Sequence, residues 1–282
     1  MTTTSLTAAP ILAPEQVRPL VLEPLVNGSV VGQVATTVYT KAPQVRVPRM
    51  GALDAAGWLA EGEEVPLGDV EFDELVFTPR SLKGGSVVTQ EALDDTSPEA
   101  AALIGAELAR DLARKIDAGF FGSNASNPDN QPPGLLDVTE HKVIDATNTP
   151  TRAWMDGWFE AAEHADSLGT RIDAVVCHPK TATDLHKTAH MIDNQTGVGT
   201  GDPLRTAIYG TPIIRTPHIA VGDLWLIDKA STWLIIRTDA EIEADASVYF
   251  TSYRIALRSR IRATYGFTRP EALIKITGVT FP

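Results

Sequence analysis

Two histidines offer the most evident chemistry in this sequence. His186 and His190 stand four residues apart in a segment of helical composition, the spacing of a zinc protease motif. That motif needs a glutamate directly after the first histidine as general base, and Lys187 occupies this position. We therefore interpret the two histidines as polar residues on the surface of a helix.

The other candidate reactive groups also lack their partners. Residues 197–201 (GVGTG) resemble a phosphate-binding loop, but no Gly-Lys-Ser/Thr follows them. Glu63 and Glu64 are adjacent on an expected loop, so their carboxylates diverge, and no nearby basic residue would position them. We interpret them as part of a solvated acidic loop. Cys177 lies in an apolar run, and the sequence contains no Gly-x-Ser-x-Gly elbow. We predict no catalytic, cofactor-binding or metal-binding residues, and hence a protein that is not an enzyme.

Composition excludes several other classes of protein. The chain has 282 residues, of which 43% are hydrophobic and 21% charged, as in ordinary globular proteins. It carries 24 basic and 36 acidic side chains, a formal net charge of -12, which disfavours a protein that grips nucleic acid. A single cysteine rules out an intrachain disulfide and favours folding in a reducing cytoplasm. No secretion signal is evident at the N-terminus, and no apolar run approaches the roughly 20 residues needed to cross a membrane.

The clearest helix signal begins at Ser97. Ser97 can cap the free amides of the first turn, Pro98 suits its first position, and Glu99 faces the positive end of the helix dipole. An apolar residue then recurs at every fourth position: Ile104, Leu108, Leu112, Ile116 and Phe120. Gly122 is a stop signal. We predict a helix over residues 98–121 with one buried stripe.

The clearest strand signal covers residues 253–267. Alternate positions hold Tyr253, Ile255, Leu257, Ile261, Ala263, Tyr265 and Phe267, and the positions between them hold Arg254, Arg258, Arg260 and Arg262. A period of two places the apolar set against a core and the arginine row on the opposite face of a sheet.

Three N-terminal segments have distinct compositions. Residues 1–27 contain four prolines and predict an extended arm, which lies on a partner or is a disordered tail. Residues 29–47 are rich in valine and threonine and predict β-strand. Residues 50–79 hold eight acidic side chains and no lysine or arginine, which predicts a projecting loop or hairpin.

Residues 150–245 alternate between helix and strand patterns, which predicts a compact α/β domain. The expected helices cover residues 149–168 and 179–190; on the first, one face holds Trp154, Trp158, Ala162, Ala165 and Leu168. Residues 172–177 predict a short buried strand, and further strands are expected at 212–215, 224–228 and 232–237. A last short strand is expected at 272–276.

Several of these segments resemble the Hong Kong 97-type major capsid proteins of tailed bacteriophages. The similarity lies in residues 57–64 and 70–77, in residues 87–97 leading into the long helix, in residues 117–122 and 133–137, and in the closing segment 253–274. It extends over about residues 30–279. Each motif is short, but their order and spacing match the family.

The resemblance implies an α+β fold with an N-terminal arm (1–28), an extended loop (49–80), a peripheral domain and an axial α/β domain (150–245). The peripheral domain would comprise 29–48, 81–149 and 246–282, with residues 98–121 as its spine helix. The family prototype carries a long N-terminal scaffolding segment, whereas only about 27 residues precede the first expected strand here. It also crosslinks its subunits through a loop lysine, which residues 50–79 lack.

The function implied by this resemblance is a structural protein that assembles as hexamers and pentamers into an icosahedral capsid around double-stranded phage DNA, without sequence-specific binding. Implied partners are a separate scaffolding protein, a portal and decoration proteins, but no membrane. Assembly would take place in the host cytoplasm, and the capsid would be part of the virion. The alternatives are the shell of an encapsulin nanocompartment and, from another class, a soluble enzyme or binding module.

The charge pattern predicts where subunits meet. An acidic loop cannot easily fold back over its own sheet, but it can lie across the arginine face of a neighbour. The predicted interface residues are Trp58, Glu61, Glu63, Glu64, Glu71 and Asp73 on the loop, and Arg254, Arg258, Arg260 and Arg262 on the strand. The alternative is that both faces are simply solvated.

Overall fold

The computed structural model describes residues 28–50, 72–89, 98–147, 153–185, 207–208, 210–245 and 247–279. The expected arm, most of the acidic loop and residues 186–206 lie outside these ranges, and with them both histidines of the pair and the glycine-rich run. None of the helices in the described ranges is long and apolar enough to cross a membrane.

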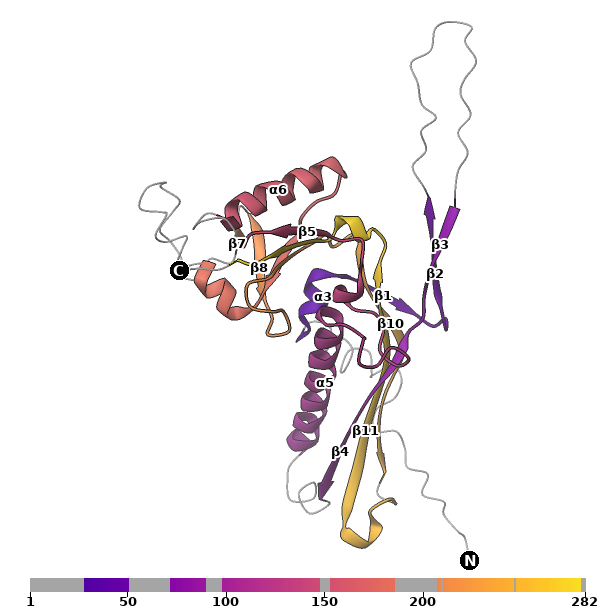
Figure 1. Cartoon of the computed structure of the whole chain (residues 1–282). Coiled ribbons are helices and arrows are strands. Elements are labelled where there is room, and N and C mark those ends of the chain that lie inside the picture. The colour runs from indigo at the N-terminus through magenta and orange to yellow at the C-terminus, as the bar shows by residue number, and fades with distance from the viewer. Residues whose placement is uncertain are drawn as a thin grey trace, which may run out of the picture.

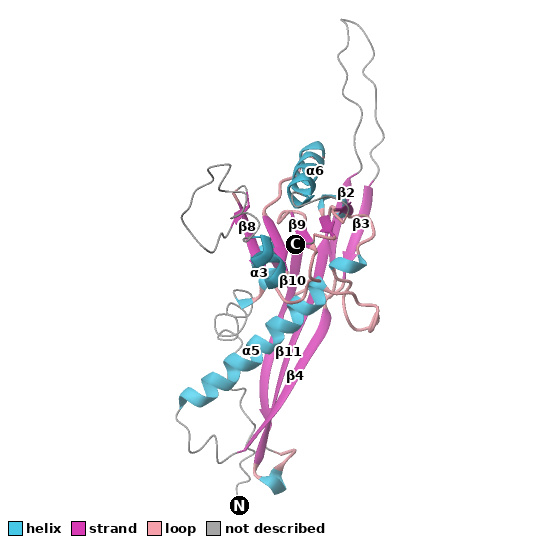
Figure 2. Ribbon diagram, turned by 60° about the vertical axis from the view of Figure 1, so that its left-hand side comes forward, coloured by secondary structure: helices cyan, strands magenta, loops and turns pink. Residues whose placement is uncertain are grey.

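A four-stranded sheet forms the long part of the molecule (Figure 1). Its strands run in the order β1 (Thr36–Thr40), β10 (Thr232–Asp245), β11 (Arg254–Phe267) and β4 (Arg80–Thr89). β1 pairs with β10 in parallel, and the other two pairings are antiparallel. Figure 2 shows α5 (Pro98–Phe121) running along β11 and β4.

The predicted helix over residues 98–121 is therefore confirmed, and it packs on the strand that the alternation indicated. Leu112, Ile116 and Phe120 are buried at 4%, 2% and 0% exposure. The hydroxyl of Tyr265 on β11 donates a hydrogen bond to the carbonyl of Ile116 at 2.8 Å. Each such buried apolar side chain stabilises the fold by about 1.5–3 kcal/mol.

A six-stranded sheet forms the second layer of strands. Its order is β5 (Lys142–Asp145), β12 (Ile274–Thr277), β9 (Leu224–Ile227), β6 (Ala174–Cys177), β8 (Thr211–Arg215) and β7 (Ala207–Ile208). α6 (Ala153–Ser167) packs against β5 and β12. Residues 179–185 are also helical. All four residues of β6 are buried, as expected for a strand covered on both faces.

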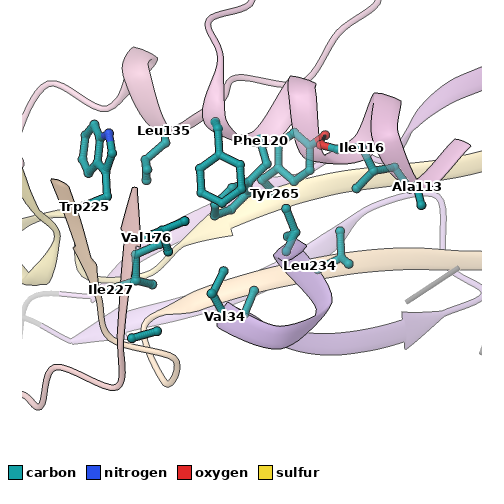
Figure 3. Close-up of a cluster of buried hydrophobic side chains, with 14 of the residues drawn as sticks. Val34, Ala113, Ile116, Phe120, Leu135, Val176, Trp225, Ile227, Leu234 and Tyr265 are labelled. Carbon is teal, nitrogen blue, oxygen red and sulfur yellow. Dashed lines mark hydrogen bonds between the residues drawn. The ribbon is translucent and has the colours of Figure 1, made fainter. Parts of the chain in front are cut away.

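The two sheets share one hydrophobic core (Figure 3). It joins Phe120 of α5 and Leu234 of β10 to Val176, Trp225 and Ile227 of the six-stranded sheet. A second core beneath α6 contains Trp158, Ala161 and Ala165 together with Ile274 and Ile276. Because side chains of the six-stranded sheet enter the first core, the two sheets are packed as one body.

A two-stranded ribbon projects from this body (Figures 1 and 2). It consists of β2 (Val45–Met50) paired antiparallel with β3 (Phe72–Phe77). This pairing agrees with the loop or hairpin expected over residues 50–79, of which residues 51–71 lie outside the described ranges.

Three short helices of the 3-10 type complete the described elements: η2 (Leu135–Asp137), η3 (Phe250–Ser252) and η4 (Pro270–Ala272). η2 packs against the C-terminal end of α5. The amide of Leu136 donates to the carbonyl of Gly122 at 3.3 Å. A Cβ on Gly134 would lie 2.3 Å from the carbonyl oxygen of Gly122 and 2.4 Å from that of Gly119, so only glycine fits there.

The prediction of strand for residues 29–34 was wrong. Val30–Val34 form a short helix, α3, and β1 begins only at Thr36. Its amides at Val30 and Val31 bond to the carboxylate of Asp117 on α5. A tertiary partner thus overrides the preference of valine for strand.

Two apolar residues lie in more exposed positions than their patterns predicted. Tyr253 is 71% exposed because it adopts a left-handed conformation (φ 51°) just before β11, which breaks the alternation. Leu168 follows the last residue of α6 and is 36% exposed, whereas Ala161 takes the buried position on that helix.

The sheets do not follow the expected boundaries of an axial domain at 150–245. β5 and β12, on either side of that range, join the six-stranded sheet, and β10, inside it, belongs to the four-stranded sheet. Strand pairing brings together segments that are distant in the sequence, and no local pattern reports this. The assignment of axial and peripheral domains stays a prediction.

Candidate subunit interface

The arginine row of β11 lies on the face of the sheet that points away from α5. Leu257, Ser259, Ile261 and Ala263 are buried. Of the arginines that alternate with them, Arg258 is exposed and Arg260 and Arg262 are half-buried. Arg254 is exposed at the start of the strand. The alternation predicted from the sequence thus extends from residue 254 to residue 263.

Neighbouring strands add further charges to this face, because residues directly opposite in an antiparallel pair share a face. Lys83 of β4 lies opposite Arg260, and Arg237 of β10 lies opposite Arg262. Like charges directly opposite each other are destabilising in a sheet. We name these six side chains the basic face: Lys83, Arg237, Arg254, Arg258, Arg260 and Arg262.

Acidic residues of β10 balance part of this charge within the same chain. The carboxylate of Glu243 accepts a bond from Nε of Arg258 at 2.7 Å and a second from its terminal nitrogen. Glu241 lies opposite Arg260 in the register, and Asp245 lies opposite Ala256. β10 thus brings acidic residues of the same chain to the register positions opposite the arginine row.

The pKa of Asp245 reflects this surrounding. The hydroxyl of Ser247 and its amide both donate to the Asp245 carboxylate, and together with the charge of Arg258 they hold the pKa of Asp245 below its usual value. The carboxyl group of Asp245 is therefore ionised at neutral pH and places a negative charge beside the basic face.

Glu243 was not among the residues predicted from the sequence, although the sequence contains a signal for its pairing with Arg258. Residues 239, 241, 243 and 245 are all acidic, a period of two that matches the period of the arginines. Two strands with complementary charge at the same period are expected to pair.

Among the predicted loop residues, the described ranges contain only Asp73. It is exposed on β3, opposite Arg49 of β2, and its carboxylate accepts the amide of Glu74 at 2.8 Å. Within the described residues it forms no ion pair with the basic face. Trp58, Glu61, Glu63, Glu64 and Glu71 lie outside the described residues, so the predicted interface between loop and arginines stays a prediction.

Ion pairs are present at the base of the ribbon. Their basic residues lie outside residues 50–79, the range in which the sequence has acidic but no basic side chains. Arg46 on β2 pairs with Glu74 on β3 at 3.2 Å, and Arg49 pairs with Glu271 of η4 at 3.5 Å. The second pair joins the ribbon to the body. The acidic excess of the hairpin therefore lies beyond its base.

The described residues offer little reactive chemistry. They contain no group of three or more histidine, cysteine, aspartate or glutamate side chains placed to hold a metal ion. Burial raises the pKa of the Cys177 thiol to about 11, which keeps it protonated and a poor nucleophile at neutral pH.

Comparison with known proteins agrees with this architecture. The sequence model of the "Phage capsid family" matches residues 10–278 of the chain. The chain belongs to the phage capsid family. The resemblance noted in the sequence is thereby confirmed.

Two curated phage proteins are similar in sequence. The "Major capsid protein" of Halomonas phage phiHAP-1 is 27% identical over 150 residues, which are 52% of this chain and 23% of that protein. The "Capsid polyprotein" of Pseudomonas phage PAJU2 is 29% identical over 271 residues, which are 84% of this chain and 39% of that protein. The capsid family chain described here thus spans well under half the length of these relatives.

Solved structures share the fold over nearly the whole chain. A chain of Microbacterium phage Oxtober96 superposes with a TM-score of 0.70 at 16% identity, covering 98% of this chain and 96% of that one. The capsid of an empty GTA particle gives a TM-score of 0.69 at 15% identity, with 99% and 95% covered. A virus-like particle from Pyrococcus furiosus gives 0.61 at 14%, with 93% and 98% covered. The α+β, Hong Kong 97-like fold expected from the sequence is confirmed.

Proposed function

We propose that this capsid family chain assembles as hexamers and pentamers into an icosahedral shell that encloses phage DNA. The observation that carries the proposal is the family match, which runs from residue 10 to residue 278 and so includes the hairpin, the long helix and both sheets.

The enclosed DNA needs no specific recognition in this proposal. A net charge of -12 makes the chain as a whole repel phosphate, and a shell that holds DNA by enclosure does not need to neutralise it. Scaffolding, portal and decoration proteins complete the assembly, which takes place in the host cytoplasm.

We propose that complementary charge also determines where subunits contact each other. We expect the acidic segment beyond β2 and β3 to lie across the basic face of a neighbour, with Glu61, Glu63 and Glu64 as its main charges. Two cross-strand pairs of the basic face bring like charges opposite each other, Lys83 with Arg260 and Arg237 with Arg262, and this supports the proposal. A partner of opposite charge would relieve both.

An encapsulin-type shell is the second candidate, because the virus-like particle from Pyrococcus furiosus has the same fold. That likeness, at 14% identity, extends to the fold alone. The family match and the two phage relatives favour the capsid.

Electron microscopy of the purified full chain tests the proposal. We expect closed particles of megadalton mass with five-fold and six-fold capsomers. A chain that remains a small oligomer at high protein concentration, both alone and with its scaffolding protein, would contradict the function as a shell protein.

A further inference from the structure

The ribbon of β2 and β3 has one half-buried face. Exposure alternates along both strands, and alternate residues of a strand lie on the same face. The exposed positions are Arg46 and Pro48 on β2 and Glu74 and Val76 on β3, and the half-buried positions are Val45, Val47, Arg49, Leu75 and Phe77. Two members of the half-buried set, Arg49 and Phe77, contact the body, so this is the face on which the ribbon rests.

Phe77 fixes the base of the ribbon. A Cβ on Gly266 of β11 would lie 3.2–3.4 Å from three carbons of the Phe77 ring, so the ring lies against bare backbone. It cannot shift sideways without losing these contacts. After two further residues the chain enters β4, which belongs to the same sheet as β11. Phe77 is thus a fixed point, which we name the pivot.

A second contact lies further along the same face. The guanidinium of Arg49 pairs with the carboxylate of Glu271 on η4 at 3.5 Å. Glu271 is itself held, because Nε2 of His164 on α6 donates a hydrogen bond to its carbonyl oxygen at 3.2 Å. Val45 lies opposite Phe77 in the register, and Arg49 stands four residues beyond Val45. At about 3.4 Å per residue the two contacts are roughly 14 Å apart, so together they define the direction of the ribbon.

Arg49 has a second acidic neighbour, and it belongs to the ribbon. Asp73 lies directly opposite Arg49, on the same face, and is exposed. The side chains of Arg49 and Glu271 are 40% and 37% exposed, so their ion pair contributes little to the stability of the fold. Arg49 can therefore exchange Glu271 for Asp73 and keep a partner of opposite charge. A groove of about 580 Å³ between β3 and residues 128–140 leaves the ribbon room to turn.

We propose that the Arg49–Glu271 pair is a latch that holds the ribbon at one angle to the body, with Phe77 as its pivot. The inference rests on the proposed shell function, because the angle matters for the contacts that residues beyond the ribbon make with a neighbour. A rotation about Phe77 displaces a point in proportion to its distance from the pivot, and a closed shell repeats the same contact at every subunit. Arg49 and Glu271 are then positioning residues for assembly, and Asp73 competes with Glu271 for Arg49.

Two spin labels on the full, unassembled chain measure the angle. One label replaces Pro48, which is exposed on the ribbon, and the other replaces Val143, which is 51% exposed on β5. Cys177 is buried and stays unlabelled. We expect the distribution of label distances to be at least two-fold broader in Arg49→Gln and in Glu271→Gln than in the chain with an intact latch. Asp73→Asn removes the competitor and should narrow the distribution, an opposite sign that loss of a merely structural charge does not predict.

Arg46→Gln is the matched control. Arg46 pairs with Glu74 at 3.2 Å on the exposed face of the same ribbon, so this substitution removes an ion pair of similar exposure without touching the latch. It should leave the distribution of distances unchanged. Combining Arg49→Glu with Glu271→Arg should restore the narrow distribution, because the ion pair forms again with its charges reversed.

Assembly gives the functional measurement. We expect Glu271→Gln to keep the urea midpoint of the parent chain and to assemble at least ten-fold more slowly in light scattering, and the reversed pair to recover the rate. Unchanged distances in both single variants, equal broadening in Arg46→Gln, or a broadened distribution with a normal rate of assembly would overturn the latch. Absence of shells from the parent chain would overturn the proposed function instead, and the label distances would still decide whether the latch exists.

Discussion

The carboxylate of Asp117 binds the hydroxyl of Ser29 at 2.5 Å, across 88 residues of sequence. The same carboxylate accepts the amides of Val30 and Val31, both at 3.1 Å, and Asp117 is only 6% exposed. One side chain on α5 thus satisfies the free amides at the start of α3. This contact fixes where the chain enters the four-stranded sheet.

Replacing Asp117 by alanine should therefore destabilise the fold strongly. It leaves one buried hydroxyl and the amides without acceptors, each at a cost of about 1–3 kcal/mol, and we expect a total loss of roughly 2–4 kcal/mol. Urea unfolding of the unassembled chain measures it. Asp111→Ala on the exposed side of the same helix is the control and should change stability by less than about 0.5 kcal/mol. Equal effects of the two substitutions would contradict the capping role.

Gly134→Ala should disrupt the junction of α5 with η2. Its Cβ would lie 2.3–2.4 Å from two backbone carbonyl oxygens and 3.0 Å from that of Phe120, and backbone cannot move away as a side chain can. We expect a loss of about 1–3 kcal/mol in the free energy of unfolding. Gly28→Ala is the matched control, because a Cβ there meets nothing within 4 Å. Wild-type stability of Gly134→Ala would show that the junction relaxes easily.

The charged contact between subunits is tested best away from Arg258, which already has Glu243 as a partner. Lys83→Glu with Arg254→Glu makes the charge of the basic face more negative by four units. Both sites are exposed, so we expect a folded chain that assembles at least ten-fold less efficiently. Adding Glu61→Lys, Glu63→Lys and Glu64→Lys should partly restore shells in light scattering and micrographs. Normal assembly of the double variant at low and physiological salt would rule the contact out.

Shells of this protein should be held together without covalent bonds. The family prototype crosslinks through a loop lysine, and residues 50–79 contain none. Boiling mature particles in detergent should therefore give a single band at the mass of the chain, 30.3 kDa. A ladder of larger bands after boiling under reducing conditions would contradict this expectation.

Cys177 should resist alkylation as long as the chain is folded. Burial raises its pKa from 9.0 to about 11, so the reactive thiolate is rare at pH 8. We expect iodoacetamide to label it at least ten-fold more slowly than in urea. Because the folded pKa exceeds the unfolded one, this group stabilises the fold fully below pH 9 and less as the pH rises toward 11. Equal labelling rates in both states would show that the thiol is accessible.

The sequence by itself determined the elements whose burial is periodic. The stripe of Leu112, Ile116 and Phe120 and the alternation around Ile261 each report one buried face, and a buried face imposes its period on the residues that form it. The order of such segments was enough to indicate the family. The loop residues of the candidate interface were proposed from charge alone, and of these only Asp73 is among the described residues.

Only the tertiary structure decided the features that depend on partners far along the chain. The residue types of Ser29–Val34 predicted a strand, but Asp117 supplies the hydrogen-bond acceptors that let residues 30–34 form a helix. The sequence pattern of the arginine row indicated no partner within the same chain, but β10 brings Glu243 to Arg258 across 15 residues of sequence. β5 joins β12 although more than 120 residues separate them. Local patterns record which side of an element is buried, whereas the partner that buries it is chosen by the packing of the whole chain.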